Sequence, residues 1–467
     1  SGYQPAVTPN IDSLVNGGCS FVNNHSNGCV TSVAFPSIFT STMPFDYGGY
    51  DDGIINRPKS FPEVLQTAGY ENYGLMTGHP CSSHFGYDRG FDRFYDLIDF
   101  YQWFRAAYVT YLAELIEEYV DNDKQSTRIF ETIVEKYKRV LLDTLKYIDK
   151  LQELPIRLPK PVKRNRIRVK VNAELRLIEK TPSLVIDKMI LLAEDYQNYL
   201  GVPEVSKTQL MYRKWKKRIA SKLHKRVFIL SERRAVGASY VNALFTSLMA
   251  NRKSKPCFVA LHYFDLHEAK LQISKILFSL NLIEIFKFLT AAFSCWKGRK
   301  VGQGGLLYDI ALRRIDDEVG KFLKVLKDSG MADNTVIVVT GDHGTEAGFP
   351  IRNFGSNLSR LFYKEHLHVP LTFYGKGIEP TKDLRLVSHM DLAPTILGLA
   401  NCPVPESFCG VDLIKNHWPV NTEVWSENAG KGRCLLGSKR LFLGRRTKKW
   451  NVIGYSDKFE PSLTEFY

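Results

Sequence analysis

Apolar runs with the character of buried strands alternate with amphipathic helical patterns along most of this 467-residue chain. Residues 335–340, with the sequence TVIVVT, are apolar and β-branched like a fully buried strand. Just before them, apolar side chains recur at helical spacing over residues 308–327, and Gly330 is a stop signal for that helix. Comparable patterns are a helix over 237–249, a strand over 257–262, a strand over 370–374 and a helix over 391–399. This alternation predicts an α/β fold in which a mostly parallel sheet is flanked by helices.

The pattern changes along the chain in a way that predicts four regions. Residues 1–98 fit the first part of the α/β domain. Residues 99–227 show long helical periodicity and a basic, proline-punctuated linker at 159–170, so we expect a basic helical insertion there. The α/β pattern resumes over 228–421 as the second part of the same domain. Short strand-like runs over 422–467 predict a small antiparallel C-terminal subdomain.

The predicted strand at 335–340 leads into Gly341-Asp342-His343-Gly344. Open α/β sheets bind their ligands at the carboxyl ends of their strands. An aspartate oxygen and an imidazole nitrogen can bind a metal there, and the glycines let the backbone approach an ion or an oxyanion closely. A turn with an Asx cap is the structural alternative for this tetrapeptide taken alone.

Several motifs accompany this corner in a characteristic order. They are TPNID at 8–12, the segment 29–41 that ends in SIFTS, GYDRGFD at 86–92, LHYFDLH at 261–267, HVPL at 368–371 and VSHMDLAPT at 387–395. Each motif alone is weak evidence, whereas their shared order is specific. In these motifs the chain resembles the sulfatase family of the alkaline phosphatase superfamily, over about residues 8–98 and 228–430. The resemblance implies an alkaline-phosphatase-like α/β fold.

The resemblance also implies catalytic and metal-binding roles. Thr31 falls where the family places its nucleophile, and Asp342 and His343 correspond to metal ligands. His262 and His267 would face the transferred or leaving group. A hydroxyl at a helix start beside a metal ion is activated by that ion and by the helix dipole. The alternatives are a threonine that serves only as a helix N-cap and histidines with a structural role.

Two further residues are candidates for binding the substrate. His368, in HVPL, matches a position that is commonly basic and on the substrate side in the family. Arg360 is the nearest candidate for a cationic residue that the family often has before this segment. An arginine on a solvated surface is the alternative for Arg360.

The segment around Thr31 departs from the sulfatase pattern. Sulfatases have Cys or Ser in a Cys/Ser-x-Pro-x-Arg motif that is modified to formylglycine, whereas this chain has Thr31-Ser32-Val33-Ala34-Phe35. Threonine cannot undergo that oxidation. Relatives with threonine at this site resemble phosphoethanolamine and phosphoglycerol transferases, which form a phosphothreonine intermediate.

The implied cofactor is a divalent metal, with Ca²⁺ favoured and Mg²⁺, Mn²⁺ and Zn²⁺ as alternatives. The family's first metal-binding aspartates end a strand that precedes the TPNID stretch, and this chain begins at Ser1. We therefore expect either a fragment of a longer protein or a protein that lacks part of its metal site and is inactive.

Charge and hydropathy limit the partners. The net charge of +14 is concentrated at 159–170 and 213–218, which indicates either a solvated basic surface or a docking surface for a polyanion. No nucleic-acid module surrounds these runs. No apolar run reaches the roughly 18–20 residues of a membrane span; the nearest, 276–296, is interrupted by Glu284 and Lys287. It is expected to be a buried or lid helix, with an interfacial membrane helix as the alternative.

The leading hypothesis is a metal-dependent hydrolase that cleaves sulfate or phosphate esters of a glycan, lipid or small molecule through Thr31. One alternative is a transferase that moves a phospho-alcohol group onto a glycan or lipid. Another is an inactive family member that binds anionic polysaccharide. No signal peptide opens the chain, so we expect a cytoplasmic or cell-surface protein. Peripheral contact with a membrane is a further possibility. The sequence does not indicate an oligomeric state.

Overall fold

The computed structural model of the chain describes two compact units. The described residues are 7–98, 126–158, 164–183, 236–267 without 251, 253 and 254, 306–345, 362–415, 423–429, 440–457 and 460–466, with single helical positions between 112 and 119 and between 286 and 295. The first unit consists of Ser1–Phe94, Ala235–Gly432 and Lys439–Tyr467, and the second consists of Tyr95–Arg234 and Arg433–Ser438. The second unit thus interrupts the first in the sequence after Phe94.

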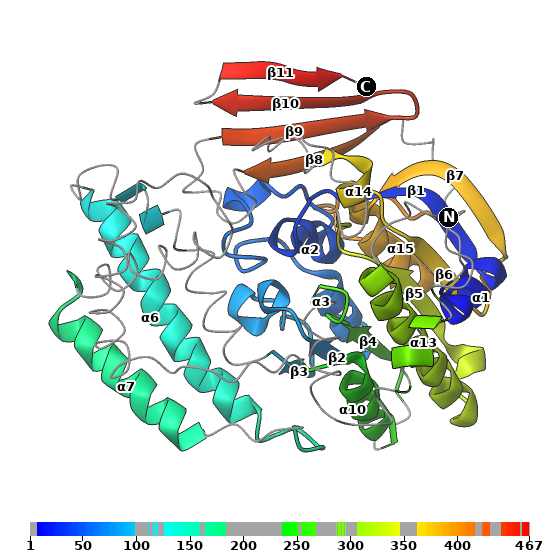
Figure 1. The fold of residues 1–467 in the computed structure, drawn as a ribbon, viewed down its shortest axis with the longest axis horizontal. Coiled ribbons are helices and arrows are strands. Elements are labelled where there is room, and N and C mark those ends of the chain that lie inside the picture. Colours follow the sequence, from blue (N-terminus) through cyan, green and yellow to red (C-terminus); the bar gives the residue numbers. More distant parts are fainter. Residues whose placement is uncertain are drawn as a thin grey trace. The chain divides into compact units, whose positions relative to one another are not determined.

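A four-stranded sheet in the first unit has the strand order β5-β6-β1-β7 (Figure 1). Its strands are β1 (Cys19–His25), β5 (Val336–Thr340), β6 (Leu371–Gly375) and β7 (Thr381–Ser388). β1 and β7 are parallel, whereas β6 is antiparallel to both β1 and β5. The α/β class was predicted correctly, but the pairing is mixed because β6 lies between β5 and β1 and runs opposite to both.

Strand β5 is less buried than its sequence predicted. Val336 is 37% exposed, and the other four residues of β5 are half-buried. In the described part of the sheet β5 pairs with β6 and stands at the edge. An apolar, β-branched run does not distinguish an edge strand from a central one, and the expectation of a fully buried strand is therefore wrong here.

A three-stranded sheet has the order β3-β2-β4. Its strands are β2 (Glu71–Met76), β3 (Arg93–Asp96) and β4 (Cys257–Leu261). β2 and β4 are parallel, with Glu71 opposite Cys257. The helix α3 (Phe61–Thr67) precedes β2 and begins with a capping box between Ser60 and Glu63. The carboxyl end of β4 leads directly into His262.

The first unit also contains six other named helices. They are α1 (Pro9–Gly17), α2 (Thr31–Thr40), α10 (Ala238–Ala250), α13 (Leu306–Asp328), α14 (Lys364–Leu367) and α15 (Leu392–Leu399), with 3-10 turns at Asp46–Gly48, His79–Cys81, Ser83–Phe85, Ala332–Asn334 and His389–Asp391. The helices predicted at 237–249, 308–327 and 391–399 are confirmed as α10, α13 and α15. Gly330 follows α13 with a positive φ of 69°, which glycine adopts at no steric cost.

The N-terminus of α1 is capped by a residue of α13. The fully buried carboxylate of Asp316 accepts hydrogen bonds from the backbone N–H of Asn10 at 3.1 Å and of Ile11 at 2.8 Å. It also accepts one from the side-chain amide of Asn10 at 2.8 Å. Asp316 thus stabilises two of the N–H groups that a helix start leaves unpaired.

Replacing Asp316 by alanine is expected to lower the free energy of unfolding by about 2–3 kcal/mol, because the half-buried N–H donors at the start of α1 lose their acceptor. Urea denaturation measures this change. Asp317→Ala is the matched control, since Asp317 is exposed and, among the described residues, pairs only with Arg313 on the same helix. That control should change stability by less than about 0.5 kcal/mol. Equal effects of the two variants would contradict the role of Asp316 as a cap.

The C-terminal residues form a four-stranded antiparallel sheet, as predicted, with the order β11-β10-β9-β8 (Figure 1). Its strands are β8 (Glu423–Ala429), β9 (Arg440–Thr447), β10 (Asn451–Asp457) and β11 (Glu460–Phe466). One face of this sheet packs on the rest of the first unit, where Phe442 and Ile453 share a buried cluster with Phe362 and Leu367. The hydroxyl of Ser426 also donates to the carbonyl of Ser26 at 2.8 Å.

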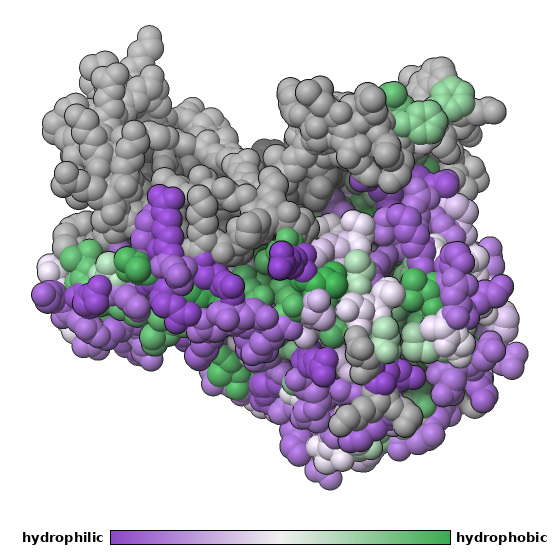
Figure 2. Space-filling model, turned by 90° about the horizontal axis from the view of Figure 1, so that it is seen from below, coloured by the Kyte–Doolittle hydropathy of each residue, from purple (hydrophilic) through white to green (hydrophobic). Residues whose placement is uncertain are grey.

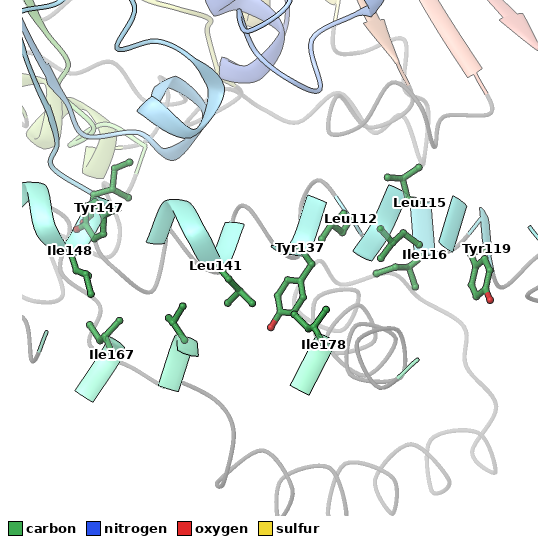
Figure 3. Packing of buried hydrophobic residues seen from close by; sticks show 13 residues of the cluster. Leu112, Leu115, Ile116, Tyr119, Tyr137, Leu141, Tyr147, Ile148, Ile167 and Ile178 are labelled. Atoms are coloured by element: carbon green, nitrogen blue, oxygen red, sulfur yellow. The ribbon is translucent and has the colours of Figure 1, made fainter. Parts of the chain in front are cut away.

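The second unit contains a pair of long helices, α6 (Thr127–Lys150) and α7 (Arg164–Lys180). Their buried aliphatic and tyrosine side chains form the cluster in Figure 3, and Tyr137 donates to the carboxylate of Glu174 at 3.0 Å. The sequence predicted helical structure here but a linker at 159–170. From Arg164 onwards this segment is helical, because Ile167 and Val171 bury one face of α7 against α6.

The apolar segment 276–296 is described at a few helical positions only. Phe288 and Ala292 pack against the cluster of Val7, Cys295 and Ile310. Other positions of the segment are exposed, namely Phe286, Leu289 and Phe293. Figure 2 shows hydrophilic residues over much of the described surface on one face, with groups of hydrophobic residues between them. Among the described helices, none has the length and apolar character required to cross a bilayer.

Candidate active site

Three side chains that are distant in the sequence meet beyond the carboxyl end of β5. The hydroxyl of Thr31, the first residue of α2, donates a hydrogen bond to Oδ2 of Asp342 at 2.7 Å. The same hydroxyl oxygen lies 3.3 Å from Nε2 of His343. Because β5 ends at Thr340, the turn that follows carries Asp342 and His343 to the start of α2. The structure therefore brings together the predicted nucleophile and both predicted metal ligands.

The position of Thr31 in α2 bears on its role. The N-cap residue of α2 is Val30, and Thr31 occupies the first helical position. The hydroxyl of Thr31 contacts Asp342 and does not cap the helix, which goes against the alternative of a simple N-cap. All ten residues of α2 are buried, so the helix start has little freedom to move. The positive end of the helix dipole favours negative charge on the oxygen of Thr31.

Local contacts orient both partners of Thr31. Nδ1 of His343 donates to the carbonyl of Gly344 at 2.7 Å, and this contact turns Nε2 of the ring toward Thr31. Oδ1 of Asp342 accepts the backbone N–H of His343 at 2.9 Å. Burial raises the pKa of Asp342, but the nearby His343 and His262 and the hydrogen bond from Thr31 outweigh it and leave that pKa lowered. Asp342 is therefore an ionised acceptor at neutral pH.

Gly344 permits the close approach of two chain segments at the site. Its N–H donates to the carbonyl of His366 at 2.7 Å. A Cβ atom at position 344 would stand 2.0 Å from the carbonyl oxygen of Glu365, which is far inside van der Waals contact. The second glycine of the Gly-Asp-His-Gly corner is thus required by packing, while the corner itself holds Asp342 and His343.

Two buried side chains hold the backbone of this corner, and the sequence did not identify either. Ser26, the residue that follows β1, donates to the carbonyl of Asp342 at 2.7 Å. His389 donates from Nε2 to the carbonyl of Gly341 at 2.9 Å. Both residues act on backbone carbonyls, and no sequence motif signals such a contact.

His262 lies at the end of β4 and belongs to the same region. Its Nδ1 is 3.0 Å from the hydroxyl of Thr77, which itself donates to the carbonyl of His262 at 2.7 Å. Thr77 therefore accepts from Nδ1 of the neutral ring. Burial lowers the pKa of His262, and the charge of Asp342 partly opposes this shift. His262 is thus neutral at pH 7, and it lies near enough to Asp342 for the carboxylate charge to affect its pKa.

His267 is exposed and follows His262 in a row of rings. It stacks on Phe264, with ring centroids 4.3 Å apart, and Phe264 lies 6.1 Å from the ring of His262. The structure thus places His267 at the same end of β4 as His262. Its catalytic role stays a prediction.

Of the two predicted substrate-binding residues, the structure describes one. Arg360 lies outside the described residues. His368 is described, and its Nε2 donates to the carbonyl of Val22 at 2.6 Å. Its ring lies 5.3 Å from that of His25, between centroids. His368 therefore stands beside the end of β1, next to the corner but without a described contact to Thr31.

Asp342 and His343 fit a divalent cation as part of its ligand shell. Oδ2 of Asp342 and Nε2 of His343 are 3.6 Å apart, a separation that two ligands of one ion can have when each bond is about 2.0–2.5 Å long. The hydrogen bond from Nδ1 of His343 to a carbonyl is the kind of contact that orients metal-binding imidazoles. Within the described ranges no group of three or more His, Cys, Asp or Glu side chains gathers around one point. Asp342 and His343 thus supply two candidate ligands among the described residues.

Comparison with known proteins identifies the family. A model of the sulfatase family matches residues 1–146 and 237–402. The chain belongs to the sulfatase family. Arylsulfatase K of Canis lupus familiaris is 28% identical over 155 residues, which cover 30% of this chain and 27% of that protein. An extracellular sulfatase SULF-1 homolog of Drosophila melanogaster is 31% identical over 120 residues, covering 23% of this chain and 10% of that protein. This sulfatase-family chain thus matches about a quarter or less of these relatives.

Solved structures support the fold. Ps i-CgsB, in complex with k-i-k-neocarrahexaose, has a TM-score of 0.51 at 17% identity, covering 99% of this chain and 81% of its own. The phosphonate monoester hydrolase of Agrobacterium radiobacter has a TM-score of 0.51 at 13% identity, covering 99% and 85%. At these identities the likeness concerns the fold alone. Together with the family match, it confirms the alkaline-phosphatase-like α/β class that the sequence predicted for this sulfatase-family chain.

Proposed function

We propose that this sulfatase-family chain hydrolyses sulfate or phosphate esters, with Thr31 as the nucleophile. The observation that carries the proposal is the 2.7 Å hydrogen bond from the hydroxyl of Thr31 to Asp342, with Nε2 of His343 at 3.3 Å. A hydroxyl becomes a strong nucleophile when a neighbouring base or cation favours loss of its proton. Asp342, ionised at neutral pH, is positioned to accept that proton.

The reaction would proceed in two balanced steps. The oxygen of Thr31 attacks the sulfur or phosphorus atom, forming a bond to it while the ester bond to the alcohol breaks. The departing alkoxide takes up a proton from water and becomes the alcohol, while Asp342 holds the proton lost by Thr31. His262 and His267 at the end of β4 are proposed to contact the leaving oxygen. Water then attacks the covalent intermediate, releases sulfate or phosphate and restores the hydroxyl of Thr31. The net change is one ester and one water converted to one alcohol and one acid.

Asp342 and His343 would hold a divalent cation, proposed to be Ca²⁺. Such an ion would stabilise negative charge on the transferred group when bound. Asp342 offers the hard oxygen that Ca²⁺ and Mg²⁺ prefer, whereas His343 also suits Zn²⁺ or Mn²⁺. The chain's own contribution is to hold these side chains beside Thr31 through the contacts of Ser26 and His389.

A chromogenic assay of the full chain tests the proposal. In the presence of Ca²⁺, the chain is expected to release 4-nitrophenol from 4-nitrophenyl sulfate or 4-nitrophenyl phosphate. A chelator should stop the release, and added metal should restore it, because the developing charge loses its cation. A chain that binds no stoichiometric metal and cleaves neither ester would support the inactive, polysaccharide-binding alternative instead.

A transferase is the second candidate, and the identity of the nucleophile favours it. Thr31 occupies the position at which sulfatases carry a cysteine or serine for oxidation, and threonine retains an ordinary hydroxyl. A covalent intermediate on that hydroxyl can pass its group to an alcohol as well as to water. Product analysis with and without an added acceptor alcohol separates transfer from hydrolysis, since a transferase yields a new ester.

A further inference from the structure

We propose that Asp265 is a positioning residue of the candidate active site, because it anchors the loop of residues 262–267 to the start of α10. This loop follows β4 and carries His262 and His267. The inference rests on the proposed function and adds to it a residue that acts through another one. In the described part of the chain, no contact joins Asp265 to Thr31 itself.

The start of α10 has no capping side chain of its own. The first residue of this helix is Ala238, and Gly237 precedes it. The carbonyl of Gly237 accepts the backbone N–H of Tyr240 at 3.0 Å and of Val241 at 3.3 Å, so Gly237 is the N-cap residue. A glycine has no side-chain oxygen for the N–H groups that a helix start leaves unpaired. The acceptor has to come from another segment or from water.

Asp265 supplies this acceptor from the loop. Its Oδ2 accepts the backbone N–H of Ala238 at 3.0 Å, although the two residues are 27 positions apart in the chain. A Cβ atom at position 237 would stand 3.2 Å from Oδ1 of Asp265, which is a tight contact, so glycine leaves room for the carboxylate. The positive end of the helix dipole favours a negative charge at this place. One carboxylate thus fixes both the helix start and the middle of the loop.

Tyr263 provides a second anchor two residues earlier. Its hydroxyl donates to Oδ1 of Asn242 in α10 at 2.6 Å. The side-chain amide of Asn242 donates in turn to the carbonyl of Glu318 in α13 at 2.9 Å and to its carboxylate at 3.1 Å. The two helices also pack through the rings of Phe245 and Phe322, whose centroids are 5.0 Å apart. The loop is therefore attached to a pair of packed helices.

The two histidines of the loop are held to different degrees. The N–H of His262 donates to the carbonyl of Leu75 in β2 at 3.1 Å, so β2 holds this residue directly. For His267, the contacts among the described residues are a turn and a ring stack, both with Phe264. The N–H of His267 donates to the carbonyl of Phe264 at 3.1 Å, and the ring centroids are 4.3 Å apart. The position of His267 thus depends on how the loop is anchored at Asp265.

Anchoring by Asp265 can be separated from its effect on stability. Burial raises the pKa of Asp265 to about 6; the Ala238 N–H and the charge of Arg314 oppose the shift, and the charge of Glu318 adds to it. Because this pKa lies above that of the unfolded chain, an ionised Asp265 lowers the free energy of unfolding at neutral pH. Asparagine keeps an acceptor oxygen without the charge. Asp265→Asn is therefore expected to be at least as stable as the parent chain at pH 7.5, as measured by urea denaturation.

Leaving-group dependence tests the positioning role in the full chain. Phenolate is a poorer leaving group than 4-nitrophenolate, so cleavage of a phenyl ester depends more on groups that contact the leaving oxygen. In the presence of Ca²⁺, Asp265→Ala is expected to lower kcat about 10-fold or more on the phenyl ester and about 3-fold or less on the 4-nitrophenyl ester. Asp265→Asn should restore cleavage of both esters, because asparagine still accepts the Ala238 N–H. Tyr263→Phe should show the pattern of the alanine variant to a smaller degree.

Asp316→Ala is the matched control, since it also removes a carboxylate that caps a helix start, that of α1. Any loss of activity in this variant should have the same factor for both esters, because a smaller folded fraction affects all substrates equally. Equal factors on the two esters in Asp265→Ala would overturn the positioning role.

Hydrogen–deuterium exchange gives a result that does not require cleavage. In Asp265→Ala, the amide of His267 should exchange about 10-fold or more faster than in the parent chain, because the turn to Phe264 loses its anchor. Mass spectrometry of peptides that cover residues 262–267 measures this rate, and Asp316→Ala should leave it unchanged. An unchanged rate in Asp265→Ala would overturn the inference even if the parent chain cleaves its ester. Faster exchange in a chain that cleaves neither ester would support the anchored loop, and the proposed function alone would fail.

Discussion

Alanine in place of Thr31 is expected to reduce ester cleavage by about 10⁴-fold or more, since loss of a catalytic nucleophile has effects of this size. The reason is geometric. The hydroxyl of Thr31 is held 2.7 Å from the carboxylate of Asp342 at the start of a fully buried helix. Initial rates of 4-nitrophenol release from the sulfate and phosphate esters measure the change.

Two further variants at position 31 separate chemistry from packing. Thr31→Val keeps the β-branched shape without the hydroxyl, and it should lose activity as fully as the alanine variant. Thr31→Ser keeps the hydroxyl, and it should retain measurable activity. Thermal unfolding should show that all three variants fold. Activity of the valine variant near that of the parent chain would remove Thr31 from the mechanism, and Asp342 with His343 would then serve another nucleophile.

Local sequence signals predicted much of the secondary structure of the first unit. The apolar period of α13 and the stop at Gly330 depend on neighbours within a few residues, and both are confirmed. Strand β5 was also predicted at its observed place. The pairing partner of β5 and its exposure were not predicted. Both depend on β6, which lies more than 30 residues further along the chain. The mixed pairing is thus a tertiary property.

In the candidate site, too, residues in local motifs could be predicted from the sequence, whereas residues that act through distant contacts could not. Thr31, Asp342 and His343 lie in motifs that the family resemblance identifies, and the structure brings them within hydrogen-bonding distance. Ser26 and His389 support them through backbone carbonyls, so their side-chain chemistry gives no sign of the role.

The support of the corner by His389 has a consequence for stability at low pH. His389 is 1% exposed, and burial lowers its pKa from 6.5 to about 4. In the unfolded chain the ring has its ordinary pKa, so between pH 6.5 and pH 4 the unfolded state binds more protons than the folded state. The free energy of unfolding therefore falls as the pH is lowered through this range, and it is fully retained above pH 6.5.

Replacing His389 by glutamine is expected to remove about 3 kcal/mol of this acid destabilisation, since each pKa unit corresponds to about 1.4 kcal/mol. Glutamine keeps an N–H donor for the carbonyl of Gly341 and does not titrate. Urea denaturation at pH 7.5, 5.5 and 4.5 measures the free energy of unfolding of both proteins. Above pH 7 their stabilities should differ by a constant amount, because neither side chain is protonated there. An unchanged loss of stability between pH 7.5 and 4.5 in His389→Gln would show that His389 titrates normally in the folded chain, and hence that it is not buried against the corner.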